Sequence, residues 1–318
     1  MYEKKQVKSF YESMVKIRRF EECVERYFLD GEIPGFMHLY IGEEAIATGV
    51  CQNLTSQDYI ASTHRGHGHT IAKGADLNGM MAELFGRKTG LCKGKGGSMH
   101  VADFRVGMLG ANGVVGGGYA LAVGAALAEK MKGTRNVAAV FFGDGASNRG
   151  TFHESLNMAA VWKLPVLFVC ENNGIAATTP YEAVCSAGHI ADRAAGYQVP
   201  GVMVDGNDVF AVYEAAGHLI EAARNGEGPA ILECRTFRQR GHFVGDPQNY
   251  RDKGSIAEHM KKDDPIGNLE VRALEEGLLS EAELKEIQDD VKKSLEEAVR
   301  FAKDSPYPEQ EELYTHVL

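Results

Sequence analysis

Two apolar runs in the middle of the chain limit what it can fold into. Residues 136–142 read NVAAVFF and residues 165–170 read PVLFVC, and neither run alternates apolar with polar side chains. A strand with one solvent-exposed face shows that alternation, so a strand without it is expected to be buried on both faces. The two runs therefore predict strands of a parallel sheet that lies between layers of helices.

Further strand-length and helix-length segments alternate along the chain. Apolar runs predict short strands at 59–62, 202–204 and 230–234. Three- and four-residue apolar spacing predicts helices at 43–51, 76–85, 119–131 and 209–224. Such alternation is typical of an α/β fold.

Helical segments extend this unit at both ends. Apolar residues from Val7 to Val24 recur at helical spacing, and a charged helical extension covers about 255–318. Two pairs have the spacing of a capping box, Thr151 with Glu154 and Ser280 with Glu283. We expect residues 1–318 to form a single α/β domain, with an N-terminal helix, a C-terminal helical extension and a parallel sheet covered by helices on both faces.

Polar residues follow both central strands directly. Gly143-Asp144-Gly145 ends the first and Asn172-Asn173-Gly174 follows the second. Parallel strands end at the same edge of a sheet, where ligands bind, so Asp144 and Asn173 can converge. Carboxylate and amide oxygens suit Mg2+, and the glycines let backbone N–H groups approach an anion. Either motif alone is an ordinary tight turn, but together they predict a diphosphate held through Mg2+.

Composition narrows the classes of partner. The formal net charge is −10, which argues against binding to nucleic acid or to an anionic membrane surface. The chain has 37 glycines among 318 residues, well above the usual share of about 7%, which indicates sites where backbone approaches a ligand or another segment closely. Six scattered cysteines without a C-x-x-C pair, and no signal or membrane-spanning segment, predict a cytoplasmic protein.

A cluster of histidines follows the predicted strand at 59–62. His64, His67 and His69 stand among glycines beside Arg65, which suggests a loop. Their spacing matches no standard zinc pattern. We therefore interpret Arg65 as a phosphate contact with histidines beside it.

With these motifs in place, the sequence resembles a known family. The Gly143-Asp144-Gly145 and Asn172-Asn173 pair is similar to the thiamine-diphosphate motif, and the stretch from Asn157 to Pro165 resembles the α subunit of two-subunit 2-oxo-acid dehydrogenase E1 components. Further matching motifs stand in the same order, from about Arg18 to Arg251: GFMH at 35–38, GRK at 86–88, KGKGGSMH at 93–100 and GVVG at 113–116.

The resemblance implies the diphosphate-binding half of a thiamine-diphosphate fold and a set of site residues. Mg2+ would be held by Asp144, Asn173 and the main-chain carbonyl of Ile175. Other residues would contact the cofactor, the phosphate groups or the aminopyrimidine: Gly145, Ala146, Arg65, His64, Gly113, Val115 and His242. His242 and His38 would be the catalytic residues, assisting proton transfer or holding the substrate.

Two positions depart from many relatives. His64 stands where they have tyrosine, and Ile175 stands where they have an aromatic residue. A main-chain ligand tolerates isoleucine, whereas the change at His64 leaves its role open.

The resemblance also implies partners and a reaction. A separate β subunit would complete the active site in an α2β2 heterotetramer, and a lipoyl-bearing E2 would accept the acyl group. The loop GHFVGDPQ at 241–248 looks most like acetoin dehydrogenase α subunits. Acetoin is therefore the expected small-molecule substrate, with pyruvate or a branched-chain 2-oxo acid as the alternative. The alternative hypothesis outside the enzymes is a non-catalytic metal- or nucleotide-binding subunit.

Overall fold

The computed structural model describes residues 2–315 and contains the expected parallel sheet. Its six strands are ordered β2-β1-β3-β4-β8-β7, and every neighbouring pair is parallel. The strands are β1 Tyr59–Ala61, β2 Met108–Gly110, β3 Ala138–Gly143, β4 Val166–Asn172, β7 Gly201–Asp205 and β8 Ala230–Arg235. A separate antiparallel pair joins β5 Ile175–Ala176 to β6 Thr179–Pro180.

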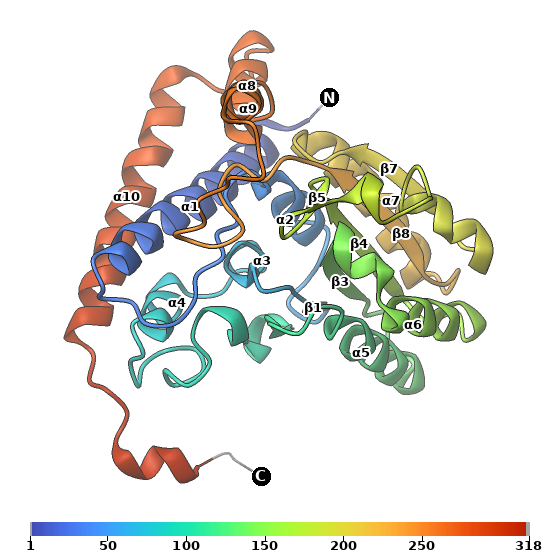
Figure 1. Cartoon of the computed structure of the whole chain (residues 1–318), viewed down its shortest axis with the longest axis horizontal. Coiled ribbons are helices and arrows are strands. Elements are labelled where there is room, and N and C mark those ends of the chain that lie inside the picture. The colour runs from blue at the N-terminus through green and yellow to red at the C-terminus, as the bar shows by residue number, and fades with distance from the viewer. Residues whose placement is uncertain (1, 316–318) are drawn as a thin grey trace.

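Helices cover both faces of this sheet (Figure 1). On one side, α7 Val209–Arg224 packs against β4, β7 and β8, α2 Glu44–Cys51 packs against α7, and α1 Lys4–Leu29 packs against α2. Farther from the sheet, α9 Pro265–Glu275 packs against α1, and α10 Glu281–Asp304 packs against α1 and α4 Leu77–Leu84. The other side holds α5 Gly118–Lys132 and α6 Gly150–Val161. The remaining α-helices are α3 Gly66–Ala72 and α8 Lys253–Lys262.

The central strands show why their sequences lack polar alternation. In β3, Ala139 and Phe141 pack into the core on one face, while Val140 and Phe142 pack into the core on the other. Both sets are almost completely buried, so each position of the strand needs an apolar side chain. The predicted α/β fold with both faces covered is confirmed, whereas the single-domain organisation stays a prediction.

Two local expectations were wrong. Thr151 and Glu154 do not form a capping box, because α6 begins at Gly150 and its N-cap, Arg149, makes no side-chain cap. Thr151 lies inside the helix and donates to the carbonyl of Gly116 at 3.4 Å. The expected loop at the histidine cluster was wrong for residues 66–72, which form the helix α3 and carry His67 and His69, whereas His64 and Arg65 lie in the turn before it. The glycines of α3 allow close packing against Ala111 and Tyr40. The capping box of Ser280 and Glu283 is confirmed at the start of α10.

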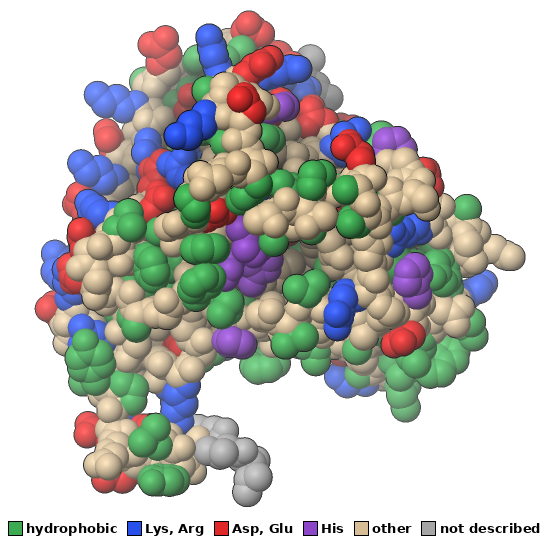
Figure 2. Space-filling model, viewed as in Figure 1, with side chains coloured by type: hydrophobic (Ala, Val, Ile, Leu, Met, Phe, Trp, Pro, Cys, Tyr) green, Lys and Arg blue, Asp and Glu red, His purple; other side chains and the backbone are tan. Residues whose placement is uncertain are grey.

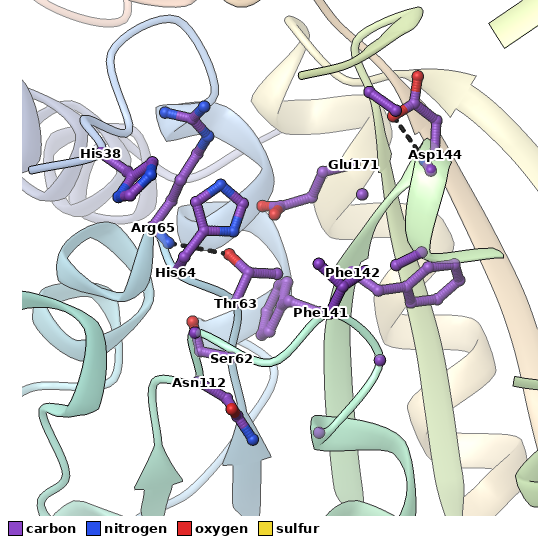
Figure 3. A pocket seen from close by; sticks show the side chains of 18 of the residues that line it. His38, Ser62, Thr63, His64, Arg65, Asn112, Phe141, Phe142, Asp144 and Glu171 are labelled. Carbon is purple, nitrogen blue, oxygen red and sulfur yellow. Dashed lines mark hydrogen bonds between the residues drawn. The ribbon is translucent and has the colours of Figure 1, made fainter. Parts of the chain in front are cut away.

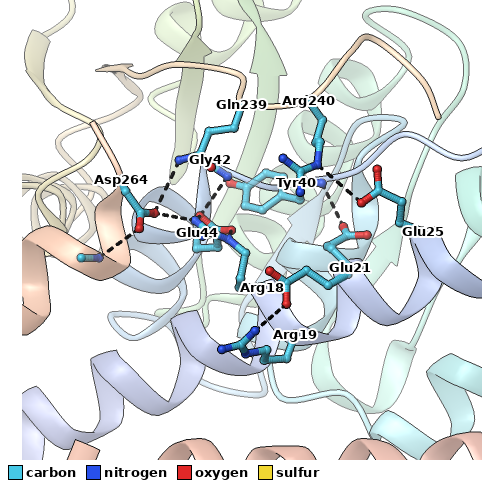
Figure 4. Close-up of polar contacts among 12 residues, drawn as sticks. Arg18, Arg19, Glu21, Glu25, Tyr40, Gly42, Glu44, Gln239, Arg240 and Asp264 are labelled. Atoms are coloured by element: carbon cyan, nitrogen blue, oxygen red, sulfur yellow. Dashed lines mark hydrogen bonds and ion pairs between the residues drawn. The ribbon is translucent and has the colours of Figure 1, made fainter. Parts of the chain in front are cut away.

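Ion pairs fix the segment that joins α1 to α2 (Figure 4). Arg18 on α1 contacts Glu44 on α2 at 2.5 Å and Asp264, the N-cap of α9, at 2.7 Å. Glu21 on α1 accepts a hydrogen bond from the main-chain N–H of Tyr40 at 3.0 Å. These contacts hold the stretch that carries His38 and Glu43 against α1. Within residues 2–315, no helix is long and apolar enough to cross a membrane.

Candidate active site

A cavity of about 350 Å³ lies at the carboxyl ends of the central strands. Its walls come from the residues after β1, β3 and β4, the segment 112–119, and the loop after β8. In Figure 3, His38, His64 and Arg65 stand across the cavity from Asp144, with Glu171 between them. All the predicted site residues line this cavity: His38, His64, Arg65, Gly113, Val115, Asp144, Gly145, Ala146, Asn173, Ile175 and His242.

Asp144 follows β3 directly, and one of its carboxylate oxygens is unsatisfied. The side chain is 2% exposed, and its Oδ1 accepts from the N–H of Gly145 at 2.8 Å. Its Oδ2 is buried and has no hydrogen-bond partner among the described residues. Burial raises the pKa of Asp144 from 3.8 to about 6. An unpartnered buried carboxylate oxygen is costly, and a bound cation would satisfy it.

The amide of Asn173 and the backbone of Ile175 lie at the end of the neighbouring strand. The N–H of Ile175 donates to Oδ1 of Asn173 at 3.3 Å. Asn173 Nδ2 donates to Glu43 at 2.8 Å. Asp144 and Asn173 come from adjacent strands and line one cavity, and together with a main-chain carbonyl they offer the hard oxygen ligands that Mg2+ prefers. The residues present therefore fit a magnesium ion.

Gly113, Gly143 and Gly145 differ in whether the surrounding chain leaves room for a side chain. A Cβ on Gly145 would lie 2.4 Å from the Cβ of Ala176, so the loop after β3 needs glycine to pack against β5. Gly143 and Gly113 have room for a Cβ within the chain. At these two positions, the packing of the described residues does not require glycine, and the backbone is open to the cavity. The N–H of Gly145 is occupied by Asp144, so it would reach a diphosphate only by changing partner.

Two arginines meet at His242. Arg65 is 4% exposed and donates to the carbonyl oxygens of Leu39 at 2.5 Å and His242 at 2.9 Å. Arg65 Nη2 and Arg238 Nη1 each lie 3.4 Å from Nδ1 of His242. The Nε of Arg238 is buried without a partner among the described residues. These guanidinium groups give the cavity a cationic wall inside a protein of negative net charge, and guanidinium groups are strong hydrogen-bond donors to phosphate.

His38, His64 and His242 form a compact group beside these arginines. One ring nitrogen of each lies within 4.8 Å of the other two, and histidines gather beside a hollow near the middle of the face in Figure 2. Burial lowers the pKa values of His38 to about 3, His64 to about 2 and His242 to about 4, and Arg65 adds to each effect. The rings are neutral at pH 7 and can accept a proton. The nearby guanidinium groups would repel a metal ion, so the group suits proton transfer better than metal binding.

The other two histidines of the sequence cluster do not line this cavity. His67 contacts Glu21 and the hydroxyl of Ser98, each at 2.9 Å. His69 contacts Glu171 at 2.8 Å and Ser62 at 2.7 Å. Both rings are completely buried. They hold α3 in place, and only His64 and Arg65 of the cluster line the cavity.

Sequence reasoning missed three charged residues of the cavity: Glu43, Glu171 and Arg238. Arg238 stands just after β8, so a strand end was an available signal. Glu171 lies within β4, and the sequence alone does not show whether a residue of a buried strand faces the cavity or the core. Glu43 precedes α2 and reads as an ordinary acidic residue at a helix start.

Comparisons with known proteins agree with the geometry. Residues 12–311 match the family described as Dehydrogenase E1 component. The chain is 57% identical over 307 residues to the α subunit of acetoin:2,6-dichlorophenolindophenol oxidoreductase of Bacillus subtilis, covering 96% of this chain and 92% of the relative. A Cupriavidus necator protein of the same name is 50% identical, with 99% and 95% covered. The α subunit of the pyruvate dehydrogenase E1 component of Rhizobium meliloti is 42% identical, with 97% and 88% covered.

Proposed function

This chain belongs to the dehydrogenase E1 component family, and we propose that it is the α subunit of an enzyme that cleaves acetoin. It is an oxidoreductase subunit of a family that uses thiamine diphosphate and works with a β subunit. Acetoin is favoured because the two relatives at 50% identity or more carry that substrate in their names, whereas the pyruvate relative is 42% identical.

The observation that carries the cofactor assignment is the unpartnered Oδ2 of Asp144. It lies in one cavity with Asn173 and Ile175, and the three would hold Mg2+ through a carboxylate, an amide oxygen and a main-chain carbonyl. Arg65 and Arg238 would neutralise the diphosphate, with His64 and the backbone of Gly145 and Ala146 beside it. Gly113 and Val115 would meet the aminopyrimidine through main-chain groups.

His38 and His242, on the opposite wall of the cavity, would accept and donate protons. Thiamine diphosphate supplies the electron sink that stabilises an acyl carbanion equivalent. Cleavage of acetoin between its carbonyl carbon and its hydroxyl-bearing carbon releases acetaldehyde, and it requires removal of the hydroxyl proton. His242 and His38 are neutral at pH 7 and so have a free ring nitrogen that can accept that proton, although burial and Arg65 make them weaker bases than a free histidine. A lipoyl disulfide would then take up two electrons together with the C2 unit as an acetyl group, whereas a dye would take up the two electrons alone and water would release the C2 unit as acetate.

We propose the remaining partners from the same membership. The β subunit would complete the site in an α2β2 heterotetramer, and the acceptor would be a lipoyl group on E2 or an artificial dye. A cytoplasmic location is supported by six cysteines that form no disulfide.

Reconstitution with a β subunit tests these proposals together. We expect a complex with the mass of α2β2 that reduces a dye faster with acetoin than with pyruvate, and only when Mg2+ and thiamine diphosphate are present. Faster turnover of pyruvate, or of a branched-chain 2-oxo acid, would replace the substrate assignment. A complex whose melting temperature does not respond to Mg2+ and thiamine diphosphate would refute the cofactor assignment.

A further inference from the structure

Glu43 is a buried carboxyl group of the cavity wall that the reaction described above does not use. It stands at the N-terminus of α2 and is 1% exposed. Within residues 2–315, its side chain accepts one hydrogen bond, from Nδ2 of Asn173 at 2.8 Å. The two residues are 130 positions apart in the sequence. Burying a carboxyl group is costly, so this contact needs a reason beyond packing.

Two contacts, with Glu43 and with the main-chain N–H of Ile175, define which way the amide of Asn173 faces. The N–H of Ile175 lies 3.3 Å from Oδ1 of Asn173, and a main-chain N–H can only donate. The atom facing Ile175 is therefore the oxygen, and the NH2 group faces Glu43. An amide oxygen has two lone pairs, so Oδ1 can accept from Ile175 and still offer one lone pair to a cation.

Asn172, the neighbouring residue, is likewise paired with a glutamate, but that pair lies outside the cavity. Asn172 donates to Glu233 at 2.6 Å, and Glu233 also accepts from the main-chain N–H of Ala191 at 2.8 Å. Glu233 is completely buried and does not line the cavity. Each asparagine of the pair is thus held by its own glutamate, and only the Glu43–Asn173 pair faces the cavity.

We propose that Glu43 is a positioning residue for the metal ion: it accepts from the amide of Asn173 and so presents the amide oxygen to the cation. The proposal rests on the proposed function, because it concerns the same Mg2+ site. Glu43 also lies near Glu171, Arg65 and Arg238, and the effect of Glu171 on its pKa is opposite to that of the two arginines. The role proposed for Glu43 is to orient the amide, which does not depend on its charge. Partners that orient metal ligands typically change affinity 10- to 100-fold.

A pair of length-matched variants separates orientation from charge. Glu43→Gln cannot ionise but keeps an oxygen that accepts from Asn173, whereas Glu43→Met has no comparable acceptor. The reconstituted complex is titrated with Mn2+ at saturating thiamine diphosphate, and the free ion is followed by electron paramagnetic resonance. We expect about 10- to 100-fold weaker Mn2+ binding in Glu43→Met and binding within about threefold of wild type in Glu43→Gln.

Controls separate failure of this proposal from failure of the proposed function. Glu233→Gln should leave Mn2+ affinity unchanged, and Asp144→Asn should abolish binding. If wild type does not bind Mn2+ with thiamine diphosphate, the magnesium site itself is refuted. If wild type binds and Glu43→Met binds equally well, the positioning role is refuted. Equal loss in Glu43→Gln and Glu43→Met would assign the effect to charge and overturn orientation as its cause.

Discussion

Arg65 donates to the main-chain carbonyl of His242 at 2.9 Å, which joins the end of β1 to the loop after β8 across 177 residues of sequence. The same guanidinium group holds the carbonyl of Leu39. The loop has its own support, since the N–H of His242 donates to Asp246 at 2.7 Å. The chain's own contacts therefore hold His242 beside Arg65.

Arg65→Lys should weaken binding of thiamine diphosphate by roughly 10- to 100-fold, because a lysine keeps the charge but cannot hold both carbonyls and a phosphate at once. Isothermal titration of the α–β complex in Mg2+ measures this. Arg240→Lys is the matched control, because Arg240 contacts Glu25 at 3.5 Å and does not line the cavity. Equal affinities for Arg65→Lys and Arg240→Lys would remove Arg65 from the phosphate site.

Asp144→Asn should stabilise the cofactor-free protein while abolishing metal binding. Burial holds the pKa of Asp144 at about 6 instead of 3.8, so the ionised carboxylate destabilises the folded state above pH 6. Such a pKa difference corresponds to roughly 3 kcal/mol in unfolding free energy at pH 8, and it disappears as pH falls below about 4. Urea denaturation at pH 8 and pH 4.5 measures the gain, which should be larger at pH 8. A variant that is less stable than wild type at pH 8 contradicts the prediction.

His64→Gln should make stability less sensitive to acid. The pKa of His64 is lowered to about 2, so its folded-state ring stays neutral while the unfolded chain takes up a proton below pH 6.5. Stability is therefore lost as pH falls below 6.5, by up to about 1.4 kcal/mol per pH unit from this group. Denaturation curves at pH 7, 6 and 5 should diverge between wild type and variant. His218→Gln, an exposed position on α7, should follow wild type; parallel curves for all three would exclude His64 as a source of acid sensitivity.

Arg238→Met should raise the pKa of His242 above its value of about 4, because burial and Arg65 would remain but the second guanidinium group would be lost. The chemical shift of the His242 ring, followed by NMR against pH, reports this directly. Adding inorganic pyrophosphate to wild type should move the same pKa upward, because the anion offsets both arginines. Arg240→Met serves as the comparison, and an unshifted pKa in Arg238→Met would mean that Arg238 does not lower the basicity of His242.

The sequence by itself determined the sheet and one end of the site. Residues 138–142 need apolar side chains on both faces, and polar residues directly after β3 and β4 must emerge at one edge, so Asp144 and Asn173 were predictable from local pattern. The tertiary structure decided the rest. The contacts of Glu43 with Asn173 and of Arg65 with His242 join segments 130 and 177 residues apart, and no local periodicity encodes them. Burial of His64 near Arg65 and Arg238, which keeps its ring neutral, likewise depends on segments that meet only when the chain is folded.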